Sequence, residues 1–97
     1  MFRVSGRSMS PTLEPGDLVF VRPFFGRLPP PEALVVVRSP RTGGRPWIKR
    51  VDSCGEHTFS LRSDNPLEGA DSRQYGSFAL EELVGVVAFM RPAVRGR

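Results

Sequence analysis

The sequence has little of the side-chain chemistry that metal centres and redox sites need. Its 97 residues include one cysteine, Cys54, and one histidine, His57. A single cysteine excludes an internal disulfide and leaves no paired-cysteine spacing for zinc. A Ser-His-Asp triad or a multi-histidine metal site would have to be built around His57, and nothing near it in the sequence suggests one. We therefore expect neither a metal nor a cofactor.

Long apolar runs are also missing. The longest one, residues 83–90, is interrupted by Gly85, whereas a helix needs about 20 apolar residues to cross a bilayer. The N-terminus enters polar sequence directly after Met1 and Phe2, without the pattern of a secretory signal. These features predict a cytoplasmic protein whose contact with membranes is at most peripheral.

Glycine and proline, in contrast, are abundant, with 10 residues of each. Both disfavour long helices, so a helical bundle is excluded and short strands joined by turns are favoured. Hydrophobic residues make up 39% of the chain, enough for one modest core. We expect a single domain over residues 1–97, with frayed ends at residues 1–4 and 91–97.

Short apolar or alternating runs bounded by turn residues predict the secondary structure. We expect strands over residues 17–22, 33–38, 47–51, 57–62 and 84–90, one helical turn over residues 79–83, and loops over residues 23–32, 38–46 and 63–76. Alternation along residues 47–51 places Trp47, Lys49 and Val51 on one face and Arg50 on the other. The predicted fold class is a small all-β domain with long loops.

Three blocks carry the candidate chemistry. The first is Ser-Gly-Arg-Ser-Met-Ser-Pro-Thr-Leu at residues 5–13 with Gly-Asp at 16–17, the second is Lys-Arg at 49–50, and the third is Ser-Asp-Asn at 63–65 with Asp-Ser-Arg at 71–73. In this order they resemble the signal peptidase I family of serine–lysine endopeptidases. The small size and the lack of an anchor make the chain most similar to the maturation proteases of nickel-type superoxide dismutases. The resemblance implies a signal-peptidase/LexA-like β fold.

The residue chemistry agrees with a serine–lysine pair. A serine hydroxyl is a poor nucleophile until a base takes its proton, and without a workable histidine that base is a carboxylate or a neutral amine. The chain has 13 arginines and one lysine, Lys49, and a lysine can lose its proton where an arginine cannot. Its pKa must then fall from about 10.4 toward the working pH, with burial as the usual cause. By resemblance, Ser8 matches the nucleophile and Lys49 the general base.

Residues around the nucleophile form the expected oxyanion loop. Ser8 lies between Gly6 and Pro11 and precedes Met9, and its backbone N–H could help to stabilise a developing oxyanion. Some members of the family carry a serine two positions before the nucleophile, and here that residue is Gly6. A side-chain donor is therefore absent at that position.

The third block supplies the expected structural support. Asp64 and Asn65 are predicted to form a turn, and the resemblance makes Asp71 and Arg73, which flank Ser72, an ion pair that orders the loop beside the site. The serine that orients the lysine in the family is replaced by Gly69. Another hydroxyl or a backbone carbonyl then orients Lys49, or activity is weaker.

The expected function is removal of an N-terminal leader from a precursor protein, with a nickel-type superoxide dismutase precursor as the candidate partner. One alternative is a LexA-like self-cleaving or regulatory serine–lysine peptidase. Another is a small basic β-barrel that binds nucleic acid, which a net charge of +4 would fit. Because no strand interleaves exposed aromatic and basic residues, we expect no nucleic-acid partner.

Overall fold

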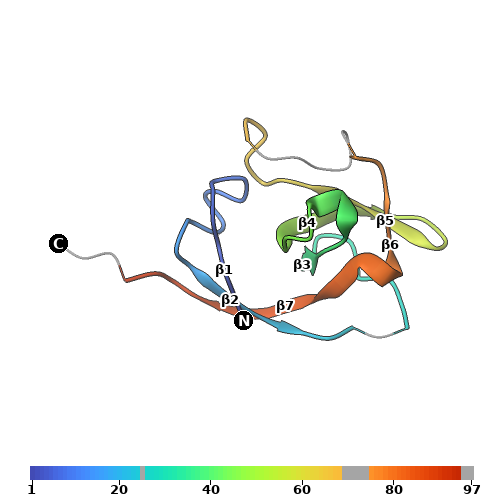
Figure 1. Ribbon diagram of the computed structural model, residues 1–97, viewed down its shortest axis with the longest axis horizontal. Coiled ribbons are helices and arrows are strands. Elements are labelled where there is room, and N and C mark those ends of the chain that lie inside the picture. Colours follow the sequence, from blue (N-terminus) through green and yellow to red (C-terminus); the bar gives the residue numbers. More distant parts are fainter. Residues whose placement is uncertain (25, 69–74, 95–97) are drawn as a thin grey trace.

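The computed structural model describes residues 1–24, 26–68 and 75–94, and in them the chain forms an antiparallel β-sheet (Figure 1). Its elements are β1 (Phe2–Arg3), β2 (Leu18–Arg22), β3 (Leu34–Val37), the 3-10 turn η1 (Pro40–Thr42), β4 (Trp47–Cys54), β5 (Thr58–Arg62), β6 (Phe78–Ala79), the 3-10 turn η2 (Leu80–Glu82) and β7 (Leu83–Arg91). The seven strands of this described part lie in the order β1-β2-β7-β3-β4-β5-β6, and the sheet curls on itself. The all-β prediction is confirmed.

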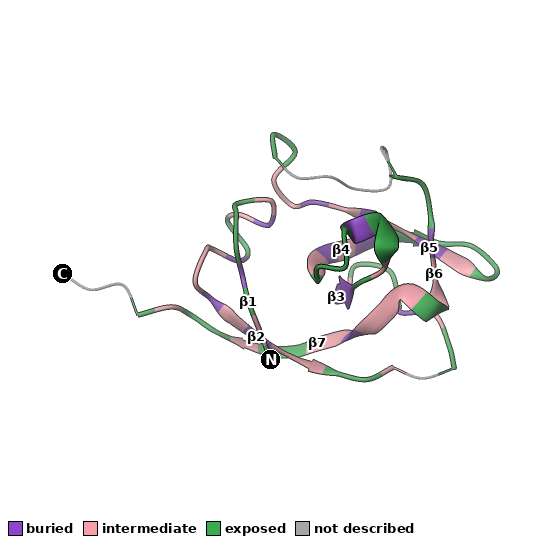
Figure 2. Ribbon diagram, viewed as in Figure 1, coloured by how far each residue is buried: buried purple, intermediate pink, exposed green. Residues whose placement is uncertain are grey.

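The predicted strands are present with shifted ends. β3 lies between β7 and β4, and Val35, Val36 and Val37 are fully buried, as its continuous apolar run predicts (Figure 2). β4 is longer than expected because its second half, up to Cys54, pairs with β5. The expected helical turn is present as the 3-10 turn η2.

Strands reach into both of the segments for which the sequence predicts fraying, residues 1–4 and 91–97. Phe2 and Arg3 pair with β2, and the buried Val4 donates its backbone N–H to the carbonyl of Asp17 over 2.7 Å. At the other end, β7 extends to Arg91, and the N–H of Ala93 donates to Oδ1 of the buried Asp17 carboxylate over 2.9 Å. Asp17 therefore holds both ends of the chain beside β2, the N-terminal end through its backbone carbonyl and the C-terminal end through its carboxylate. A buried carboxylate needs such hydrogen-bond donors. Residues 95–97 lie outside the described part.

The two faces of the sheet pack into separate hydrophobic clusters. One contains the buried side chains of Val35, Val37, Val51, Phe59, Leu61 and Phe78, with Trp47 packed against it. The other contains Val4, Met9, Leu13 and Val19, with Ile48 packed against it. The expected alternation along β4 is confirmed, since Trp47 and Val51 belong to one cluster and Ile48 to the other. No helix in the described residues has the length and apolarity needed to cross a membrane.

Candidate active site

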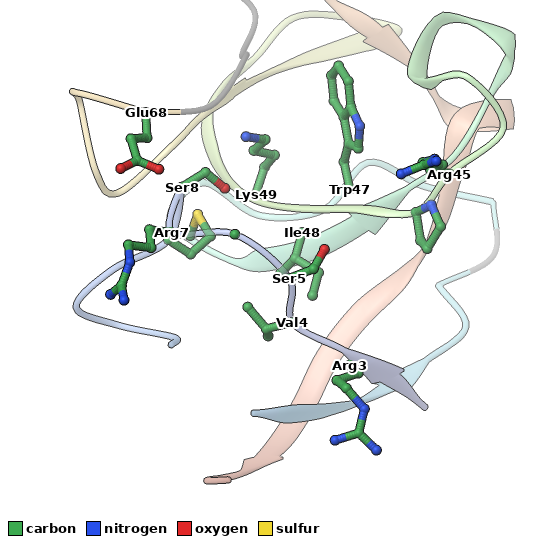
Figure 3. Close-up of a pocket in the computed structure, with 13 residues that line it drawn as sticks. Arg3, Val4, Ser5, Arg7, Ser8, Arg45, Trp47, Ile48, Lys49 and Glu68 are labelled. Atoms are coloured by element: carbon green, nitrogen blue, oxygen red, sulfur yellow. The ribbon is translucent and has the colours of Figure 1, made fainter. Parts of the chain in front are cut away.

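A pocket brings the first and second sequence blocks together (Figure 3). One wall is the segment of residues 3–9, which begins at the last residue of β1, and the other is residues 45–49, which lead into β4. Glu68 lies at one side. Ser8 and Lys49 both line this pocket, so side chains 41 positions apart in the sequence (49 − 8) share one space. The two residues that the sequence analysis predicts as nucleophile and general base therefore lie in the same depression of the fold.

Lys49 is unusually buried for a lysine, with 4% of its surface exposed. Its Nζ donates to Oγ of Ser63 over 2.9 Å and lies 5.6 Å from the centroid of the Trp47 ring. Burial disfavours the ammonium form, whereas the face of the indole ring favours it. The amine is thus bonded to a hydroxyl and lies beside an aromatic ring.

Ser63 belongs to the third sequence block, but the sequence analysis gives it no role beside Lys49. It is 7% exposed and follows β5 directly. Its place follows from the pairing of β4 with β5, in which Arg50 lies opposite Arg62. In an antiparallel pair, the residue before Arg50 then lies opposite the residue after Arg62, which places Ser63 beside Lys49.

The next two residues join this serine to the nucleophile loop. Asn65 donates its backbone N–H to the carbonyl of Ser8 over 2.8 Å and its side-chain Nδ2 to the carbonyl of Arg7 over 3.0 Å. The N–H of Asp64 lies 3.4 Å from Sδ of Met9. The segment of residues 63–65 therefore contacts the general-base candidate at one end and the nucleophile candidate at the other.

Asp64 is itself fixed by the arginine next to Lys49. Arg50 points away from Lys49, and its Nε and Nη2 donate to the two carboxylate oxygens of Asp64 over 2.9 and 2.8 Å. Thr12 of the nucleophile loop donates to the same carboxylate over 2.5 Å. The hydrogen bonds from Arg50 and Thr12 outweigh burial and hold the pKa of Asp64 below its usual range, while the bond to Asp64 raises the pKa of Arg50. The turn expected here is present, since Leu67 donates its N–H to Oδ1 of Asn65 over 3.1 Å.

The nucleophile loop has a backbone that suits its residues. Gly6 has a φ of +74°, a conformation that a residue with a side chain adopts only at a cost, so glycine fits this position. Met9 is buried in the second hydrophobic cluster and also lines the pocket, which anchors the loop beside the half-buried Ser8. Pro11 is exposed and is not among the lining residues of the pocket.

Four residues with roles expected from the resemblance, Gly69, Asp71, Ser72 and Arg73, lie outside the described residues. Among the residues that are described, no group of three or more histidine, cysteine, aspartate or glutamate side chains could hold a metal ion. Cys54 donates from Sγ to the carbonyl of Pro29 over 3.0 Å, and the His57 side chain is exposed. Neither residue lines the pocket of Ser8 and Lys49.

A serine and a buried lysine on facing walls of one pocket, carried by a curled antiparallel sheet, are features of a hydrolase with a serine nucleophile. The comparison with protein families agrees with this class. The chain belongs to the Peptidase S24-like family, whose model matches residues 1–87. This membership supports a serine peptidase of the LexA-like type of fold. Among curated proteins, no sequence matches the chain.

Proposed function

We propose that this protein is a serine endopeptidase in which Ser8 is the nucleophile and Lys49 is the general base. The observation that carries this proposal is the placement of both residues on one pocket, with Lys49 almost entirely buried. Burial favours the neutral amine, which is the form that can accept a proton. The pKa of Lys49 is therefore expected to lie below that of free lysine.

The proposed reaction follows from these two groups. Neutral Lys49 takes the proton of the Ser8 hydroxyl while Oγ attacks the carbonyl carbon of the substrate peptide bond. The resulting oxyanion accepts a hydrogen bond from the backbone N–H of Ser8. The ammonium of Lys49 then gives its proton to the leaving amine, which leaves an acyl-enzyme. A water molecule, deprotonated by neutral Lys49, attacks the ester, and the proton returns to Ser8 Oγ as the acid leaves.

The walls of the pocket suit an extended polypeptide substrate. The pairing of β4 with β5 begins at Arg50, so residues 47–49 have no strand partner on that side among the described strands. The segment of residues 3–9 forms the opposite wall. A substrate lying between these two segments can add as a strand, with backbone hydrogen bonds providing affinity. The scissile bond is then presented to Ser8 and Lys49.

The proposed substrate is the N-terminal leader of a precursor protein in the cytoplasm, with a nickel-type superoxide dismutase precursor as the candidate. Resemblance of the three sequence blocks to signal peptidase I supports a peptidase that removes leaders, and the dismutase precursor is the candidate that the sequence analysis favours within that family. Co-expression of this protein with the precursor should yield a shortened, nickel-loaded dismutase, measured by intact mass and bound nickel. A leader that stays attached while the peptidase cleaves other peptides would reject this substrate and leave the serine–lysine mechanism standing.

Substitution of the two reacting groups tests the mechanism. Ser8→Ala, Lys49→Ala and Lys49→Arg should each abolish cleavage, the last because a guanidinium does not act as a base near neutral pH. Ser60→Ala is the matched control. The hydroxyl of Ser60 on β5 forms an exposed hydrogen bond with the hydroxyl of Ser53 on β4, away from the pocket. A serine-reactive penem should label the wild type and Ser60→Ala but not Ser8→Ala. Turnover retained by either Ser8→Ala or Lys49→Ala would disprove the pairing.

The family match also supports a second candidate, a LexA-like peptidase that cleaves its own chain or regulates a partner. The rate constant of self-cleavage within one chain is independent of protein concentration, whereas the rate of cleavage of a separate precursor rises with enzyme concentration. The same match favours a peptidase over the nucleic-acid-binding module considered from the charge. Salt-dependent DNA binding by the Ser8→Ala variant would reopen that alternative.

A further inference from the structure

The amine of a general-base lysine must be oriented as well as neutral. A neutral amine has two N–H groups and one lone pair, and only the lone pair can accept the proton of the nucleophile. Lys49 reaches the pocket on a flexible four-carbon stem, so its amine rotates freely unless a hydrogen bond stops it. The bond from Nζ to Oγ of Ser63, 2.9 Å long and buried at both ends, uses one N–H in this way.

Ser63 is well placed to act as a fixed acceptor because its neighbours are held firmly. Arg50 binds the carboxylate of Asp64 through two hydrogen bonds, and Asn65 is bonded to the carbonyl groups of Arg7 and Ser8. The backbone that carries the Ser63 hydroxyl is thus attached to the strand of Lys49 and to the loop of Ser8. A supporting hydrogen bond is effective when its own residue is locked by such contacts.

We propose that Ser63 is the positioning residue of Lys49, and that its hydroxyl oxygen holds the amine with the lone pair facing Ser8. This role rests on the proposed function of Lys49 as the general base. The resemblance described above places the lysine-orienting hydroxyl at position 69, where this chain has Gly69. Ser63 supplies the hydroxyl from the other end of the same block, at the end of β5.

Kinetic measurements separate positioning from a merely structural role. Ser63→Ala should lower kcat by about 10- to 100-fold, as expected when a reacting group is misplaced, with KM changed less than about twofold. Ser63→Thr keeps the hydroxyl and should retain most of the activity, and Ser60→Ala should match the wild type. A kcat of folded Ser63→Ala equal to that of the wild type would overturn the proposal. So would equal losses of kcat in Ser63→Ala and Ser63→Thr.

The single lysine of the chain allows a second test that does not depend on activity. Protein labelled with ¹³C at the lysine ε-carbon gives one signal, which reports the ionisation of Lys49 directly. The charged groups around the same pocket are Arg3, Arg7, Arg45 and Glu68, and they are unchanged in these variants. Because the Ser63 oxygen accepts more strongly from an ammonium than from an amine, Ser63→Ala should move the titration of this signal to lower pH. Ser60→Ala should leave it in place.

The two measurements distinguish the failure of this inference from the failure of the proposed function. An unchanged lysine titration in Ser63→Ala would overturn the inference even if Ser8→Ala and Lys49→Ala are inactive as expected. Conversely, cleavage retained by Lys49→Ala would reject the proposed function, and the positioning role with it. A shifted titration together with a lower kcat and activity retained in Ser63→Thr supports the role of Ser63.

Discussion

Asn65 donates its backbone N–H to the carbonyl oxygen of Ser8 over 2.8 Å, which joins the loop after β5 to the loop that carries the candidate nucleophile. Two positions earlier, Ser63 accepts a hydrogen bond from Lys49. The segment of residues 63–65 therefore contacts both Ser8 and Lys49, the two residues that we propose to react. This arrangement makes the Ser63–Asn65 segment a sensitive target for substitution.

Removal of the Asn65 side chain should lower both the activity and the stability of the protein. Asn65→Ala removes the bond from Nδ2 to the carbonyl of Arg7 and the bond from Leu67 to Oδ1. We expect a loss of about 1–2 kcal/mol in the free energy of unfolding, together with a kcat about tenfold lower. Chemical denaturation and steady-state kinetics measure the two effects. Leu67→Ala, in the same turn and 90% exposed, is the control, and equal effects of both variants would contradict the prediction.

The rate of cleavage should depend on pH through Lys49. Only the neutral amine accepts a proton, so kcat/KM should rise with pH through a single ionisation that lies below the usual pKa of lysine, about 10.4. Initial rates on a peptide substrate between pH 6 and pH 10 measure this profile, and a histidine-modifying reagent should not change it. A flat profile over this range would be inconsistent with Lys49 as the base of a rate-limiting chemical step.

The ion pair of Arg50 and Asp64 should make the free energy of unfolding depend on pH in the acid range. Hydrogen bonds from Arg50 lower the pKa of Asp64 in the folded protein, so the contribution of the carboxylate is complete above the ordinary aspartate pKa of about 3.9. It is lost as pH falls through the lowered folded value. At pH 7, Asp64→Asn should cost about 2 kcal/mol of unfolding free energy, and the difference from the wild type should shrink toward pH 2.

Denaturant unfolding at several pH values measures this dependence. Glu56→Gln is the control, because the Glu56 carboxylate is almost fully exposed. A destabilisation by Asp64→Asn that is as large at pH 2 as at pH 7 would show that the carboxylate charge is not its cause.

Gly85 on β7 should be intolerant of any side chain. A Cβ at this position would lie 2.6 Å from the carbonyl oxygen of Arg22 on β2, and this backbone atom has little freedom to move. Gly85→Ala should therefore lower the free energy of unfolding by about 1–3 kcal/mol. Gly55→Ala is the matched control, because its Cβ would meet the side chain of Thr58 at an ordinary 3.5 Å. Equal melting temperatures for the two variants would contradict the predicted clash.

Much of the fold could be predicted from local patterns. The continuous apolar run of β3 indicated a strand buried on both faces, and Val35, Val36 and Val37 are fully buried. Strand β1 is not predicted by the sequence, because its two residues, Phe2 and Arg3, are too few to show a hydrophobic period. The C-terminal half of β4 is not predicted either. Asp52 to Cys54 are polar or small residues, and their extended conformation depends on pairing with β5.

The sequence by itself determined the chemical groups of the site and the faces on which they lie. A chain with one lysine and a Ser-Met-Ser-Pro-Thr-Leu block pointed to Ser8 and Lys49, and alternation alone placed Trp47 and Val51 on the lysine's face of β4. The tertiary structure decided the burial of Lys49, its bond to Ser63 and the pairing of Arg50 with Asp64. These contacts join residues 14 positions apart through the register of β4 and β5, and the link from Asn65 to Ser8 spans two loops. Hydrogen bonding and desolvation at such a site depend on segments that only sheet pairing brings together, whereas strand periodicity is a local property of the chain.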